Sequence, residues 1–229
     1  MNYKRCRIFL ILLAAMAAHG QEQNQPQNPT LPTITFDVFW EASTPQSYTI
    51  TVDSLGKAKY VSRSPTRPED KAQPNDEDYQ IEFTFSAANR DRLFELAKEA
   101  NYFHGDFDYK QHAIANTGKK ILGYADPVRN FTTTYNWSEN KAIEEITRIF
   151  QGTSSTLQHG RRLQFMRRFD KLGLEAELKG MEDMAQNHNL AELQAIATTL
   201  ENIMNDSSVL HVARQRARRL LAQAGSPRD

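Results

Sequence analysis

Hydrophobic and polar residues alternate along much of the first two thirds of the chain, with the period of two that is typical of half-buried β-strands. The clearest case is residues 79–85, where Tyr, Ile and two Phe alternate with Gln, Glu and Thr. Gly56 supplies a turn, so the segments on either side of it are expected to form a hairpin. The predicted strands are residues 34–40, 48–52, 57–62, 79–85, 119–124 and 130–137.

Two helices are predicted among these strands, because their apolar residues recur at helical spacing. Ser86 is expected to cap the first helix, and Asn101 is expected to end it in the left-handed region. Ser138 is expected to cap the second helix, which is predicted to end near Gly152.

From about Thr156 the pattern has helical spacing only, and it predicts four helices. The third of them is expected to begin at Asn189, since Asn189 and Glu192 have the spacing of a capping box. The fold class is therefore α+β: a mostly antiparallel sheet of about six strands with two helices, followed by an all-helical C-terminal segment of about four helices. We expect an α+β domain at residues 34–152 and a helical domain or tail at residues 153–225.

The N-terminus has the pattern of a secretory signal peptide. A basic stretch at residues 4–7 precedes an apolar run at residues 8–18, and small residues at Ala18 and Gly20 suit cleavage. We expect residues 1–20 to be removed near Gly20 and the protein to be exported, to the periplasm or out of the cell. The apolar run is too short to cross a hydrocarbon core of about 30 Å, and no membrane span is predicted after cleavage. Residues 21–33, rich in Gln, Asn and Pro, are expected to form a disordered leader.

The charge balance and the cysteine count exclude several kinds of site and partner. The chain has 28 basic residues, 28 acidic residues and one cysteine, Cys6, which lies in the predicted signal peptide. Cleavage also removes three basic residues, which leaves a slightly acidic mature chain without a thiol. Disulfides and Cys-ligated zinc are thereby excluded, and a nucleic-acid partner is not expected.

Charge is segregated along the helical tail. Residues 161–171 and 214–219 are rich in Arg and Lys, whereas residues 174–206 are mostly acidic where they are charged. This order predicts that the packed helices neutralise one another. The alternative is a protein partner that binds through the charged tail.

The best candidate for chemistry is a group of two imidazoles and two carboxylates within nine residues: His104, Asp106, Asp108 and His112. All four side chains can bind a divalent metal. The alternative is that the aspartates stabilise a turn and the histidines lie on the surface. No nucleophile elbow and no glycine-rich phosphate loop is present in the sequence, so no catalytic residue and no cofactor are predicted.

Aromatic residues on the predicted strands offer another candidate site. Trp40, Tyr60, Phe131, Tyr135 and Trp137 lie on strands that are expected to share a sheet, where an exposed face could stack sugars or peptides. The alternative is that they pack in the core, and the exposure of the two tryptophans distinguishes the two.

Residues 47–53, Gly56, Tyr60 and residues 94–103 together resemble exported bacterial domains of unknown function. Those domains pair a T-I-x-x-D-G-x-x-x-Y hairpin with a strand, a helix and an A-N-F-F ending. The resemblance covers about residues 45–150, and the chain departs from it at Ser54 and Leu55 and at Tyr102. It implies an exported α+β module and no assigned activity.

Three functions follow from these patterns as hypotheses. The leading one is a noncatalytic envelope or extracellular interaction module. The alternatives are a metal-dependent enzyme that uses the His104, Asp106, Asp108 and His112 cluster, and a small-ligand or glycan binder that uses the aromatic sheet face.

Overall fold

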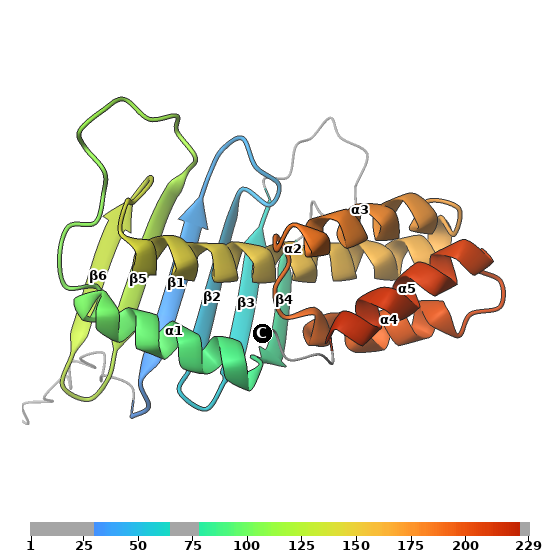
Figure 1. Ribbon diagram of the computed structural model, residues 1–229, viewed down its shortest axis with the longest axis horizontal. Helices are drawn as coiled ribbons and strands as arrows, with labels where there is room; N and C mark the ends of the chain where they lie inside the picture. The colour runs from blue at the N-terminus through green and yellow to red at the C-terminus, as the bar shows by residue number, and fades with distance from the viewer. Residues whose placement is uncertain (1–29, 65–77, 225–229) are drawn as a thin grey trace, which may run out of the picture.

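The computed structural model describes residues 30–64 and 78–224, so the predicted signal peptide, most of the leader and most of the proline-rich loop before residue 79 lie outside the described residues. The described chain forms a six-stranded antiparallel sheet with the strand order β4-β3-β2-β1-β5-β6 (Figure 1). The predicted fold class and all six predicted strands are confirmed. The strands are β1 (Thr33–Phe39), β2 (Ser47–Asp53), β3 (Lys57–Arg63), β4 (Tyr79–Thr84), β5 (Lys119–Ala125) and β6 (Asn130–Tyr135).

Two helices, α1 (Ala87–Glu99) and α2 (Lys141–Phe169), cover one face of the sheet (Figure 1). The alternation in β1 shows how the sequence selects that face, since Ile34, Phe36 and Val38 are buried whereas the residues between them are partly exposed. Phe36 stacks on Phe150 of α2 with ring centroids 5.1 Å apart. Burial of each such side chain stabilises the fold by roughly 1.5–3 kcal/mol.

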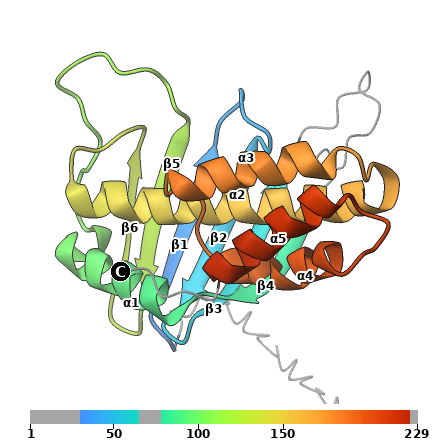
Figure 2. The ribbon, with the colours of Figure 1, turned by 45° about the vertical axis from the view of Figure 1, so that its right-hand side comes forward.

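The predicted end of the second helix near Gly152 is wrong. Instead, α2 is one helix of 29 residues that continues past β4 (Figures 1 and 2). Its glycines mark close packing: a Cβ at Gly152 would lie 3.0 Å from the backbone nitrogen of Ala191, and one at Gly160 would collide with Ile196. Glycine in a helix costs about 1 kcal/mol relative to alanine. At these two positions the absence of a side chain lets residues 190–196 cross α2 closely.

Three further helices follow α2 (Figure 2). They are α3 (Leu174–Gln186), α4 (Ala197–Met204), which follows the short 3-10 helix η2 (Leu193–Ile196), and α5 (His211–Ala224). Of these, α3 and α4 pack against α2, whereas α5 packs on α3 and α4. Their buried apolar residues belong to the same hydrophobic cluster as those of the sheet. Within the described ranges, none of the helices is both long enough and apolar enough to cross a membrane.

The predicted capping box at Asn189 and Glu192 is wrong, because residues 189–192 are not helical and Glu192 has a left-handed backbone with φ of 57°. The Glu192 side chain caps α1 instead, where it accepts hydrogen bonds from Ser86 and Asn89. The predicted cap at Ser86 is confirmed, since its hydroxyl accepts from the Asn89 amide at 3.3 Å. Glu192 and Ser86 thus share the capping of one helix.

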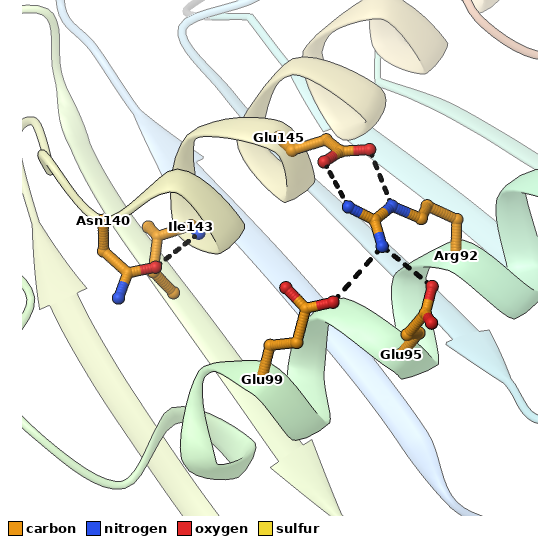
Figure 3. Close-up of polar contacts among 6 residues, drawn as sticks. All are labelled: Arg92, Glu95, Glu99, Asn140, Ile143 and Glu145. Carbon is orange, nitrogen blue, oxygen red and sulfur yellow. Dashed lines mark hydrogen bonds and ion pairs between the residues drawn. The ribbon is translucent and has the colours of Figure 1, made fainter.

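Two other predicted helix ends can be compared with the structure. Asn140, not Ser138, caps α2 through its side chain, which accepts from the Ile143 amide at 3.2 Å (Figure 3). Asn101 adopts the predicted left-handed conformation, with φ of 50°. The next two residues, Tyr102 and Phe103, are also left-handed, and this turn buries Phe103 completely.

Ion pairs join the helices. Arg92 of α1 binds both oxygens of Glu145 on α2, at 2.9 and 2.7 Å (Figure 3). In the helical tail, Glu182 of α3 binds Arg216 and Arg219 of α5. Mutual neutralisation of the tail helices is confirmed for these pairs.

Candidate ligand-binding cavity

A cavity of about 780 Å³ lies between one end of the sheet and α2. Its walls come from the β1–β2 connection, the start of β5, the segment after β6, the middle of α2 and the end of α3. Figure 1 shows these strand ends on the side of α2 away from α1. The volume falls within the range of small-molecule sites, about 300–1,000 Å³.

Two tryptophans and two tyrosines line the cavity. Trp40 and Trp137 remain 37% and 38% exposed, just beyond the ends of β1 and β6, whereas Tyr135 is buried. Trp137 packs edge-on against Tyr109 with centroids 5.0 Å apart, and this contact holds the indole in place. Burial raises the pKa of both Tyr48 and Tyr135, so their hydroxyls stay neutral and can donate or accept hydrogen bonds.

Lys120 is a cationic residue of the cavity wall, and only 4% of the residue is exposed. Its Nζ donates to the backbone oxygen of Asn136 at 2.7 Å, to both the hydroxyl and the backbone oxygen of Thr117, and to the Gly118 oxygen. All these acceptors are neutral, and among residues 30–64 and 78–224 no carboxylate forms an ion pair with Lys120. Burial lowers the pKa of Lys120 because no nearby acid compensates the desolvation of its charge.

The α2 wall presents polar side chains to the cavity. Ser154 and Gln158 bind the buried Tyr60 hydroxyl at 3.1 and 2.7 Å, which fixes α2 to the sheet. Arg148 forms no ion pair with any residue of the described segments, and Glu145, the acid whose pKa it helps to lower, is already bonded to Arg92. Arg148 is exposed on α2, where it lines the cavity.

A second group of charges lies where α2 meets α3. His159 Nδ1 lies 2.6 Å from Glu177, and Arg162 binds the other oxygen of the same carboxylate at 3.2 Å. Burial alone would raise the pKa of Glu177, but the hydrogen bond with His159 and the charge of Arg162 outweigh it and lower the pKa. Glu144 is the acid among the lining residues, and it is paired with Lys141.

The structure does not bring the four predicted metal ligands together. Asp106 binds Lys110, whereas Asp108 accepts from the Asn136 amide at 2.8 Å and so supports the cavity wall. The His104 ring packs on Phe131, and His112 lies beside Tyr109. Within the described segments, no three His, Cys, Asp or Glu side chains are placed to hold a metal ion.

The structure separates the residues of the candidate aromatic site into two groups. Trp40, Tyr135 and Trp137 line the cavity, but they do so at the end of the sheet and not on an open sheet face. Tyr60 is fully buried and Phe131 packs on His104. Sequence reasoning missed Arg148 and Lys120. For Lys120 a signal was available, because it shares the inward positions of β5 with Leu122 and Tyr124.

No protein-family model matches the chain, and a search of curated proteins finds no significant match.

Proposed function

We propose that the protein is a noncatalytic binding module that takes a small organic ligand into the cavity between the sheet end and α2. The observation that carries the proposal is the pair of partly exposed tryptophans, Trp40 and Trp137, beside a cavity of about 780 Å³. Aromatic rings at such a position offer flat apolar surface to a sugar or an aromatic ring. The predicted signal peptide is consistent with a binding role outside the cytoplasm.

The cavity supports this proposal better than the helical tail supports a protein interface. The charged side chains of the tail that would attract a partner largely form ion pairs within the fold, as Glu182 does with Arg216 and Arg219. Polar cavity residues such as Gln151 and Ser155, by contrast, face a space large enough for a ligand.

Tryptophan fluorescence tests the proposal directly, because the chain has two tryptophans and both line the cavity. The purified protein is titrated with a panel of sugars, amino acids and aromatic acids. We expect at least one compound to give a saturable change in emission and a higher melting temperature. If no compound changes either quantity, the proposal is wrong.

A cavity-filling variant provides the control. Ser155→Phe places a ring in the cavity, and it should abolish the saturable change. Thr132→Phe adds the same ring on the exposed side of β6 and should leave binding intact. Equal binding by both variants would place the ligand elsewhere and contradict the proposal.

A further inference from the structure

The charges that line the cavity are mostly positive. Lys120, Arg148 and Arg162 are cationic. Glu144 is the acid in the wall, and Lys141 already neutralises it at 2.8 Å. Glu177, which is not a lining residue, forms an ion pair with Arg162. Two cations therefore remain without an ion-pair partner in the described parts of the chain, namely Lys120 and Arg148.

The environment of Lys120 favours a negative charge nearby. The residue is buried and its ammonium group has neutral acceptors alone, although buried charges in proteins are normally paired. The lowered pKa of Lys120 reflects this missing compensation. An anion in the cavity would interact with this charge through a medium less polar than water, where the attraction is stronger than at the surface.

Arg148 offers the complementary hydrogen bonds. It is exposed on α2 at the edge of the cavity, and its guanidinium donors are not used by an ion pair in the described residues. A planar guanidinium binds carboxylate, sulfonate or phosphate oxygens in a bidentate manner. Nearby Gln151 and Ser155 can donate further hydrogen bonds.

From this arrangement we infer that the cavity binds an organic anion, in which a ring lies against Trp40 or Trp137 and an acidic group interacts with Arg148 and Lys120. The inference rests on the proposed function and adds the chemical class of the ligand. A carboxylate, a sulfonate and a phosphate share the required chemistry, so the acidic group is the feature recognised.

A matched pair of probes tests this class. Anilinonaphthalene sulfonate and N-phenylnaphthylamine have the same ring system and differ in the sulfonate group. Energy transfer from tryptophan to the bound probe reports occupancy beside Trp40 and Trp137. We expect the anionic probe to bind at least about fivefold more tightly than the neutral one at low salt, and this preference should fall in high salt.

Arginine variants assign the preference to the cavity. Arg148→Gln should weaken the binding of the anionic probe by roughly three- to tenfold and leave the affinity for the neutral probe unchanged. Arg218→Gln removes an exposed arginine of α5 outside the cavity and should change neither affinity. Both sites are exposed, so both variants should fold, and their urea midpoints check this.

The outcomes separate the inference from the proposed function. If both probes bind equally, or if Arg148→Gln and Arg218→Gln behave alike, the inference is overturned while the cavity remains a binding site. If Ser155→Phe leaves both probes bound with full energy transfer, the proposed function fails as well.

Discussion

The Glu192 carboxylate accepts a hydrogen bond from the backbone amide of Ser86 at 2.7 Å, although the two residues are 106 positions apart in the chain. Its other oxygen accepts from the Ser86 hydroxyl at 2.9 Å and from the Asn89 side chain. A negative charge at this position also interacts favourably with the N-terminal end of the α1 dipole. Glu192 is buried, so these bonds are shielded from water.

Removal of this carboxylate should destabilise the whole chain. We expect Glu192→Ala to lower the free energy of unfolding by about 2 kcal/mol, because buried donors lose a charged acceptor. The urea midpoint measures the loss. Glu201→Ala, at an exposed position of α4, is the control and should stay within about 0.5 kcal/mol of the parent. Equal midpoints for the two variants would show that the cap contributes nothing.

The two helical glycines Gly160 and Gly180 should respond oppositely to alanine. A Cβ at Gly160 collides with Ile196, so Gly160→Ala is expected to cost about 1–3 kcal/mol through overpacking. Among the described residues, no atom beyond the adjoining backbone of α3 lies within 4 Å of a Cβ at Gly180, so Gly180→Ala should stabilise α3 by about 0.5–1 kcal/mol. Thermal unfolding of the two variants distinguishes them, and a shift of the same sign in both would contradict the packing at Ile196.

Asn101 occupies a backbone conformation that glycine and asparagine tolerate and branched residues do not. Because Asn101 has φ of 50°, Asn101→Val should lower the free energy of unfolding by about 1–2 kcal/mol. Asn101→Gly should cost less, since glycine adopts positive φ without a steric penalty. Chemical denaturation of both variants provides the comparison. A valine variant as stable as the glycine variant would argue against the left-handed turn.

Acid should destabilise the helical tail through Glu182. Burial would raise the pKa of this carboxyl group, but hydrogen bonds from Arg219 and Arg216 lower it below its usual value. The pKa of Glu182 is therefore lower in the folded state than in the unfolded state, where it is about 4.3. The stabilisation from its ion pairs is complete above the unfolded pKa and is lost as the pH falls through the folded pKa. Unfolding free energies at pH 7, 5, 4 and 3 should therefore decline towards acid.

The variant Glu182→Gln isolates this contribution. It should be less stable than the parent at pH 7 and should lose less stability between pH 5 and 3, since it cannot take up the proton. Glu201→Gln should retain the pH dependence of the parent. Parallel curves for the parent and Glu182→Gln would exclude Glu182 as a source of the acid sensitivity.

The strands were predictable nearly to the residue, because a sheet with one covered face imposes its alternation on the sequence, as Ile34, Phe36 and Val38 show. The continuity of α2 was not predictable, since glycine occurs both at helix ends and at close helix crossings, and only the position of Ala191 beside Gly152 distinguishes the two. Glu192 illustrates the same limit: the spacing suggests a local cap, whereas the carboxylate caps a helix a hundred residues away.

The candidate site was less predictable than the fold. Its aromatic residues were found, but the cavity joins strand ends to the middle of α2, and these segments are far apart in the sequence. The sequence feature that came nearest to indicating the polar part of the cavity was Lys120, a charged residue at an inward position of β5.

The length of α2 also determines which wall of the cavity can adapt. The helix is about 44 Å long, and it is anchored by the sheet in its first half and by α3 and α4 in its second half. A helix held on both sides of a cavity cannot bend away from it at low cost. Under the proposed function, adjustment of the cavity to the shape of a ligand should therefore come from the loops around Trp40 and Trp137, while α2 stays fixed.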